Sequence, residues 1–252
     1  FKQKTAYEIS LGLVGSEMCI RDRLLGIGVN ANTSLKNTIG GENSNWILTS
    51  MAWGLSVFVA VFITGQYSGA HLNPAVTVGL AVAGKFSWSL VLGYVFSQLL
   101  GAMFGSWLAY IVYIDHYRLT KDENKVRGSF CTGPAIKNYK NNFFSESIAT
   151  FILVFAIFFI VEPNLEIEGE IVNFGLGALG ALPVGILVWV IGMTLGGTTG
   201  FAINPARDFG PRLIYSLLPR KNKNADWSYS WVPVFGPLFG AICAGLLYTF
   251  LI

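Results

Sequence analysis

The tripeptide Asn-Pro-Ala occurs twice in the chain, at Asn73–Ala75 and at Asn204–Ala206. Each copy follows a stretch without Asp, Glu, Lys or Arg, and the second is followed at once by Arg207 and Asp208. Asparagine directly before proline favours a helix that the asparagine caps and the proline begins. A side-chain amide carries two N–H donors and one acceptor, so these residues are suited to hydrogen bonding with neutral solutes.

The two copies belong to an internal repeat. Seven residues of the first copy match residues of the second, each pair 131 positions apart. The matched residues are Gly65, Ser68, Gly69, Asn73, Pro74, Ala75 and Gly79 with Gly196, Thr199, Gly200, Asn204, Pro205, Ala206 and Gly210. The apolar segments that follow the asparagines, Pro74–Gly84 and Pro205–Leu218, are too short to span a bilayer. Such half-length helices are tolerated in a membrane only where protein buries them or a water-filled cavity borders them.

The elements around the repeat are those of an all-α membrane protein. The chain has 252 residues, of which 53% are hydrophobic and 12% charged, which is far more apolar than one soluble core needs. Stretches of roughly 20 apolar residues read as membrane spans, and these must be helical because lipid offers no partner to backbone groups. Five stretches qualify: Trp46–Tyr67, Ser87–Tyr113, Phe143–Val161, Phe174–Leu195 and Trp231–Ile252.

An odd number of crossings separates the two half-helices, so the second enters from the opposite face and the repeat is inverted. We expect the two helices to meet end to end near the midplane, with their positive dipole ends facing a narrow lumen. The amides of Asn73 and Asn204 would then donate to a passing oxygen while their carbonyls cap the helices. Two ordinary capped helices remain the alternative, although a repeated and inverted pair disfavours it.

The segments S-G-A-H-L-N-P-A-V-T (residues 68–77) and G-F-A-I-N-P-A-R-D-F-G-P-R (residues 200–212) resemble the two pore-loop motifs of the aquaporin, or major intrinsic protein, family. Their context resembles its glycerol-facilitator branch. The resemblance covers roughly residues 24–252. It implies an aquaporin-like right-handed bundle of six transmembrane helices plus two half-helices, with a pore in each subunit of a homotetramer.

The resemblance also implies a selectivity constriction of four residues. Counting from the asparagines places Trp53, Gly192, Phe201 and Arg207 at its positions. Trp53 and Phe201 would form an apolar corner for a carbon chain, and Arg207 would donate to adjacent hydroxyls in a fixed fork. Gly192 would leave room where water-selective relatives carry a bulkier side chain, usually histidine.

Three further residues are expected to support the pore loops. The resemblance implies that His71 lines or braces the inner mouth, and a proton relay is the less favoured alternative because the only other histidine, His116, lies in a polar loop. Glu146, an ionisable residue inside a span, would accept backbone N–H groups of a pore loop, as the matching residue does in the family. Asp208 lies in the first helical turn, where the dipole favours an acid, and could pair with Arg212.

The N-terminal segment departs from the family pattern. Residues 1–23 contain seven charged side chains and no apolar run of spanning length. Only Leu24–Asn30 resembles the exit of the family's first helix. We therefore predict that residues 1–23 are non-native, that the first helix is truncated or replaced, and that residues 24–252 form one channel domain. The loop charges also oppose the family's orientation, because the segment expected inside, Glu162–Glu170, is acidic.

The function expected from these features is passive movement of glycerol, small polyols, water and other small neutral solutes such as urea, with protons and ions excluded. The alternatives are a water-selective aquaporin and, further off, a coupled transporter with broken helices, which would need acidic residues near the midplane. No nucleophile and base pair, metal cluster or cofactor loop is apparent, so we expect no enzyme activity, no metal and no cofactor. The scattered net charge of +3 does not indicate nucleic-acid binding. The expected location is a membrane, the plasma membrane in particular.

Overall fold

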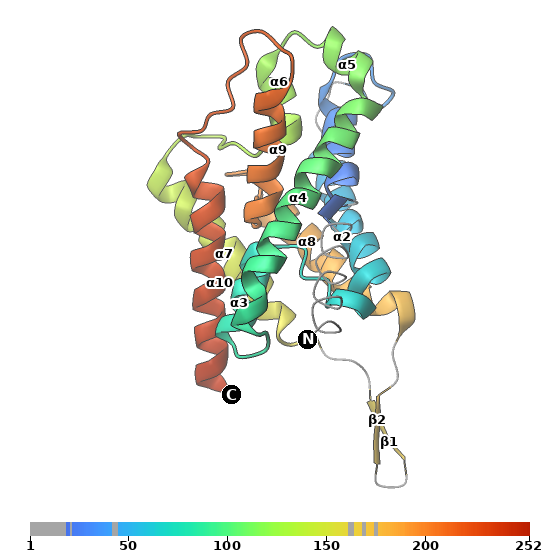
Figure 1. Cartoon of the computed structure of the whole chain (residues 1–252), viewed down its shortest axis with the longest axis vertical. Coiled ribbons are helices and arrows are strands. Elements are labelled where there is room, and N and C mark those ends of the chain that lie inside the picture. Colours follow the sequence, from blue (N-terminus) through green and yellow to red (C-terminus); the bar gives the residue numbers. More distant parts are fainter. Residues whose placement is uncertain (1–18, 21, 42–44, 161–163, 168–169, 174–175) are drawn as a thin grey trace, which may run out of the picture.

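The computed structural model describes residues 19–20, 22–41, 45–160, 164–167, 170–173 and 176–252. Its described part is a bundle of helices with one small hairpin (Figure 1). The elements are α2 (Trp46–Ser68), α3 (Pro74–Val82), α4 (Trp88–Val112), α5 (Ile114–Leu119), α6 (Glu123–Phe130), α7 (Tyr139–Ile157), β1 (Asn164–Ile167), β2 (Glu170–Asn173), the 3-10 helix η1 (Gly177–Ala181), α8 (Leu182–Leu195), α9 (Pro205–Leu217) and α10 (Trp231–Leu251).

The two predicted half-helices are present. α3 spans 9 residues and α9 spans 13, which at about 1.5 Å per residue is too short to cross the hydrocarbon core. Each begins with proline, and each is capped by an asparagine whose side-chain oxygen accepts a backbone N–H at the helix start. The Asn-Pro pattern therefore fixes where both helices begin, because the proline needs no N–H partner there.

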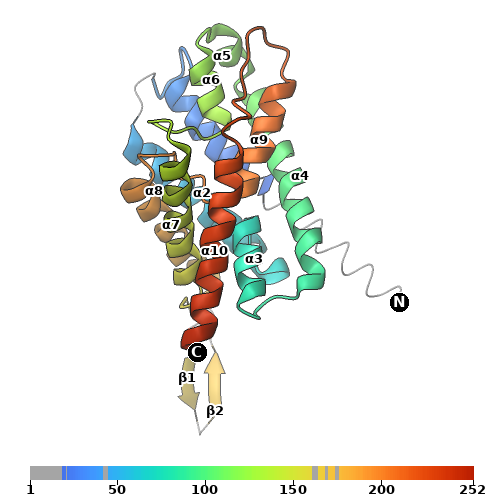
Figure 2. The same ribbon diagram turned by 90° about the vertical axis from the view of Figure 1, so that its left-hand side faces the viewer.

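Each half-helix packs against a long helix from the other half of the chain. α3 lies beside α10 and α9 lies beside α4 (Figures 1 and 2). A glycine makes each approach possible. A Cβ at Gly79 of α3 would lie 3.2 Å from the carbonyl oxygen of Ala241, and one at Gly210 of α9 would lie 2.9 Å from the Cβ of Ala102. Gly79 and Gly210 are one of the repeat pairs, so each half-helix uses the equivalent glycine to approach a long helix of the other half.

Four helical stretches within the described residues are long and apolar enough to cross a membrane: Trp46–Ser68, Trp88–Val112, Gly177–Leu195 and Trp231–Leu251. All four overlap predicted spans. The fifth predicted span corresponds to α7, which begins earlier than expected, at Tyr139, and ends at Ile157. α7 packs along α10, and α2 packs along α8.

The predicted start of the fourth span, Phe174, lies outside the described residues. The segment before it contains a feature that the sequence analysis did not include. β1 and β2 pair antiparallel, from Asn164 opposite Asn173 to Ile167 opposite Glu170. This hairpin projects from one end of the bundle (Figure 1), and the helical part of the span is described from η1 at Gly177 onward.

A further helix covers residues 22–34, and residues 19 and 20 are also helical. Most of the predicted non-native segment, residues 1–18 and 21, lies outside the described residues. The helix packs closely against Trp53, because a Cβ at Gly26 would lie 2.5 Å from the indole ring. Trp53 in turn donates its indole N–H to the side-chain oxygen of Asn30 at 3.1 Å. This helix therefore supports one wall of the central cavity.

Candidate functional site: a cavity between two half-helices

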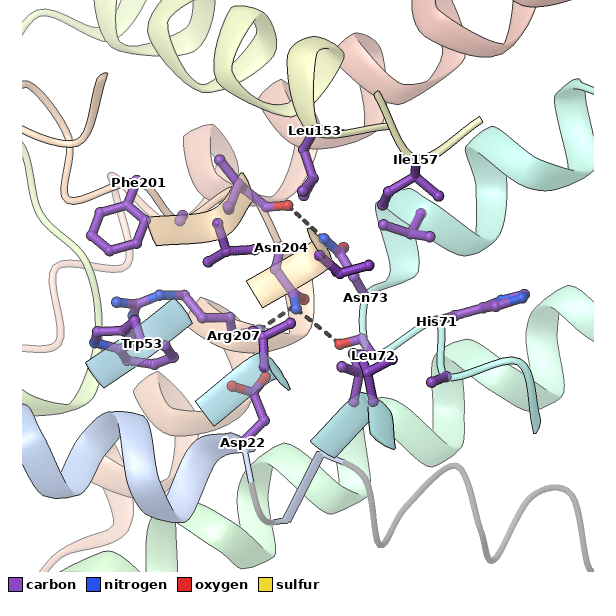
Figure 3. A pocket seen from close by; sticks show the side chains of 18 of the residues that line it. Asp22, Trp53, His71, Leu72, Asn73, Leu153, Ile157, Phe201, Asn204 and Arg207 are labelled. Atoms are coloured by element: carbon purple, nitrogen blue, oxygen red, sulfur yellow. Dashed lines mark hydrogen bonds between the residues drawn. The ribbon is translucent and has the colours of Figure 1, made fainter. Parts of the chain in front are cut away.

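The two asparagines meet at the centre of the molecule and are tied to each other's loop. Asn73 donates from its side-chain nitrogen to the carbonyl of Ile203 at 2.7 Å, and Asn204 donates to the carbonyl of Leu72 at 2.9 Å (Figure 3). Their side-chain oxygens cap their own helices. One N–H of each amide is therefore used inside the protein. An amide nitrogen carries two donors, and the described residues offer no hydrogen bond to the second one. The sequence argument did not anticipate these two reciprocal bonds.

The loops that lead into the half-helices share an unusual backbone. Ala70 and Leu72 have φ values of 46° and 58°, and the residues 131 positions later, Phe201 and Ile203, have φ values of 40° and 43°. Non-glycine residues rarely adopt positive φ, and such positions persist where the surroundings hold them firmly. The internal repeat is thus visible in the backbone conformation as well as in the sequence. Strained backbone of this kind is typical of functional sites.

Trp53, Phe201 and Arg207 lie at one end of a cavity of about 140 Å³ that both asparagines also line. The guanidinium carbon of Arg207 lies 4.1 Å from the centre of the Trp53 ring, a cation–π contact (Figure 3). Arg207 is 5% exposed, and among the described residues its Nη1 atom has no hydrogen-bond partner. An orphaned donor of this kind in a cavity is suited to an oxygen of a solute.

Gly192 does not line this cavity and lies behind Phe201. A Cβ at Gly192 would lie 3.0 Å from two atoms of the Phe201 ring and 3.0 Å from the Cβ of Ser50. The absent side chain therefore makes room for the phenylalanine ring. Gly192 therefore affects the width of the cavity indirectly, because it determines where the Phe201 ring can lie.

His71 lies toward the other end of the cavity, beyond the two asparagines (Figure 3). Its Nδ1 atom is 3.1 Å from the hydroxyl of Thr77, which also accepts a hydrogen bond from Gln98. The ring packs against Phe86 and Tyr94, with centroids 4.6 and 5.0 Å away. These contacts hold the imidazole in place at the cavity wall.

Glu146 of α7 braces the second pore loop. Its two oxygens accept the backbone N–H groups of Ala202 and Ile203 at 2.9 and 2.8 Å. The carboxylate is 1% exposed, and hydrogen bonds of this kind offset the large free-energy penalty of burying it. The carbonyl of Ile203 also accepts the hydrogen bond from Asn73. Glu146 therefore fixes the residue to which the Asn73 side chain is bonded.

Asp208 lies in the first turn of α9 and fastens the segment before α7 to that helix. It accepts from the backbone and hydroxyl of Thr132 at 2.8 and 2.5 Å, and from Arg212 at 2.7 Å. Arg212 also donates to the carbonyls of Thr132 and Ala225. Asp208 and Arg212 are both fully buried. The sequence analysis named Asp208 and Arg212 but gave no sign of Thr132.

A second ion pair joins neighbouring segments outside the spans. Lys137 donates to Asp226 at 2.8 Å. Burial alone would raise the pKa of Asp226, but hydrogen bonds from Lys137 and Ser228 outweigh it and lower that pKa below its usual value. The carboxylate is therefore charged at neutral pH.

Comparison with known proteins agrees with this geometry. The family model described as "Major intrinsic protein" matches residues 16–248. The chain belongs to the major intrinsic protein family. Because several of its described helices are long and apolar enough to cross a bilayer, this family member is an integral membrane protein. The match begins inside the segment 1–23 that the sequence analysis set apart.

Several members of the major intrinsic protein family are similar over most of their length. A probable glycerol uptake facilitator protein of Thermotoga maritima is 48% identical over 90% of this chain and 93% of its own. The glycerol uptake facilitator protein of Streptococcus pneumoniae R6 is 44% identical over 90% of this chain and 92% of its own. Among solved structures, the aquaglyceroporin from Plasmodium falciparum superimposes with a TM-score of 0.76 at 31% identity, over 94% of this chain and 95% of that one.

The cavity of this major intrinsic protein also includes residues that sequence reasoning missed. Asp22 and Arg23 line it, are 0% and 2% exposed, and form an ion pair. The guanidinium of Arg23 lies 5.1 Å from the centre of the Trp53 ring, which also contacts Arg207. No motif marks these two charges, since they fall where the sequence shows no periodic pattern.

Proposed function

We propose that the chain is a passive channel for glycerol, other small neutral polyols and water. The observation that carries this proposal is the pairing of Trp53 with Arg207 at one end of the cavity. The ring offers an apolar surface for a carbon chain, while the unpartnered Nη1 atom of Arg207 offers a donor to a hydroxyl. The names of the similar proteins from Thermotoga maritima and Streptococcus pneumoniae support glycerol as the solute.

The roles of the remaining residues follow from the same proposal. Trp53, Gly192, Phe201 and Arg207 make up the selectivity constriction: three of them line it, and Gly192 contributes by making room for the Phe201 ring. Asn73 and Asn204 hold the two half-helices together, and each presents one N–H to the solute column. His71, Glu146 and Asp208 support the pore loops. Arg207 and the helix N-termini present positive potential, which disfavours protons and other cations. Transport requires no chemical step and no cofactor.

The direct test is solute flux in lipid vesicles that contain the purified protein. Stopped-flow light scattering should report fast re-swelling in glycerol and slow re-swelling in a six-carbon sugar alcohol, relative to empty vesicles. Fast water flux across the vesicle membrane without re-swelling in glycerol would favour a water-selective pore. Glycerol uptake that requires a proton or sodium gradient would instead indicate a coupled transporter.

We further propose that the channel is a homotetramer in the plasma membrane, as the family resemblance implies. Large apolar side chains on the outer faces of the helices, including Leu92, Phe96 and Phe250, are exposed in the single chain and need lipid or other subunits to cover them. The mass of the solubilised particle, after subtraction of bound detergent, tests the number of subunits.

We also propose that residues 1–23 did not originate with the rest of the chain, which forms one channel domain over residues 24–252. In support, Asp22 Oδ1, Arg23 Nε and Arg23 Nη1 are buried without hydrogen-bond partners among the described residues. Although the two side chains form an ion pair with each other, native proteins rarely leave so many buried polar atoms without a hydrogen bond. The sequence of the gene in genomic DNA tests this, because a continuous native reading frame through residues 1–23 would overturn it.

A further inference from the structure

Trp46 lies just outside the proposed constriction and no role has been assigned to it above. It is the first residue of α2, seven positions before Trp53, so about two helical turns separate the two indoles. Asn45 caps the helix by accepting the N–H of Leu48 at 3.1 Å. The backbone of Trp46 is therefore fixed at a defined helix start, and its side chain is half-buried.

The indole of Trp46 is bonded to α8. Its Nε1 atom donates to the carbonyl of Gly192 at 3.0 Å. Gly192 lies in the last turn of α8, where carbonyl groups lack donors from their own helix. The bond therefore ties the start of α2 to the end of α8 directly behind the proposed constriction.

The same indole contacts the ring of Phe201 edge to face. Their centroids are 5.7 Å apart and their planes meet at 84°, an arrangement that aromatic pairs prefer. Two glycines allow this packing. A Cβ at Gly196 would lie 2.6 Å from Phe201 and 2.7 Å from Trp46, and a Cβ at Gly192 would lie 3.0 Å from Phe201. The phenylalanine ring is thus held between the bare end of α8 and the indole.

The position of the Phe201 ring depends on the contacts around it as well as on the backbone. Its φ value of 40° is strained for a residue with a side chain, and strained positions are kept by contacts around them. We propose that Trp46 is a positioning residue that fixes the Phe201 ring and thereby sets the upper size of solute that passes. This inference rests on the proposed polyol channel and adds a determinant of its selectivity.

The test compares glycerol with four- and five-carbon polyols in vesicles that contain Trp46→Ala protein. Release of the Phe201 ring should raise the permeability ratio of the larger polyols to glycerol by about threefold to tenfold, the effect of losing one aromatic contact. Trp46→Phe keeps an aromatic ring but loses the N–H donor and part of the indole surface, and it should shift the ratio in the same direction by less. The matched control is Trp107→Ala, at a residue 45% exposed on the outer side of α4, which should leave the ratio unchanged.

A double-mutant cycle with Phe201 separates positioning from general loss of structure. If Trp46 acts through the ring, Trp46→Ala should have little further effect on the ratio in a Phe201→Ala background. Additive effects, or an unchanged ratio in both Trp46 variants, would overturn the inference and leave the channel proposal standing. Absence of glycerol flux in the unaltered protein would instead overturn the channel proposal itself.

Discussion

At Gly192, a missing side chain determines where a neighbouring ring can lie. The distance from Asn204 along the sequence predicted that Gly192 belongs to the constriction, and we expected its missing side chain to leave room there for the solute. In the structure that space is occupied by Phe201, which only a three-dimensional arrangement can reveal. The sequence could predict which residues lie near the site, but it could not predict which of them line the cavity and which lie behind another side chain.

Gly192→His should lower glycerol flux more than water flux. The new side chain meets Phe201 and Ser50 at its first atom. We expect it to displace the phenylalanine ring, which lines the cavity, and so to narrow the passage. We expect glycerol permeability to fall at least about tenfold, which corresponds to ~1.4 kcal/mol of added barrier. Vesicle re-swelling in glycerol measures the glycerol flux, and vesicle shrinkage in an impermeant osmolyte measures the water flux.

Gly93→His is the control for this substitution. Gly93 lies in α4, and a Cβ there would meet nothing within 4 Å, so both fluxes should stay as in the unaltered protein. Equal losses of glycerol and water flux in Gly192→His would contradict the assignment of Gly192 to the constriction.

At the scale of elements, the half-helices were the most predictable part of the fold. An asparagine and a proline specify a cap and a first residue by local chemistry alone, and both α3 and α9 begin there. The hairpin β1–β2 was missed although Leu165, Glu166 and Ile167 alternate in polarity, a pattern typical of a strand. A search for long apolar spans passes over such a short signal.

The attachment of α9 to the segment before α7 depends on one buried carboxylate. Asp208→Asn removes the charge that pairs with Arg212 and leaves that guanidinium buried among fewer acceptors. Breaking a buried ion pair in this way destabilises a protein by about 3–5 kcal/mol. Unfolding of the detergent-solubilised protein, followed by circular dichroism in increasing denaturant, should show this loss.

Asp115→Asn serves as the comparison, because Asp115 is paired with Arg118 on the surface and its side chain is 81% exposed. Surface pairs contribute about 0–1 kcal/mol, so its unfolding curve should nearly coincide with that of the unaltered protein. Similar curves for Asp208→Asn and Asp115→Asn would show that Asp208 does not carry the attachment.

At the scale of the whole molecule, the internal repeat predicted that two distant segments meet. In the structure the asparagine cap of each half-helix is hydrogen-bonded to the loop that leads into the other. The helix over residues 22–34 was less predictable. Its first two residues place charges in the cavity, and the charged sequence around them has no apolar period from which a span could be inferred.

Replacing the Asp22–Arg23 pair by leucines should stabilise the protein and raise glycerol flux. The pair is buried, incompletely hydrogen-bonded and in the cavity, and apolar replacement of a buried ion pair is neutral or stabilising by about 1–4 kcal/mol. Flux should rise because the solute no longer meets two strongly polar groups that retain it. Denaturant unfolding and vesicle swelling on the same preparation measure both effects.

The same double replacement at the exposed pair Asp115–Arg118 controls for a general effect of added leucines. It should change neither the unfolding midpoint nor the flux. Lower stability and lower flux in the Asp22→Leu, Arg23→Leu variant would mean that the pair supports the open cavity, and would argue that these two residues are native.

The bonds from Asn73 to Ile203 and from Asn204 to Leu72 have a consequence for how such an architecture could arise. Each half of the chain contributes one donor and one acceptor, so neither half alone can form either bond. Two identical half-length chains packed antiparallel about a two-fold axis would form both. A small ancestral protein could therefore have built the passage as a symmetric pair before gene fusion joined the copies, and the two later diverged while the shared seam stayed in place.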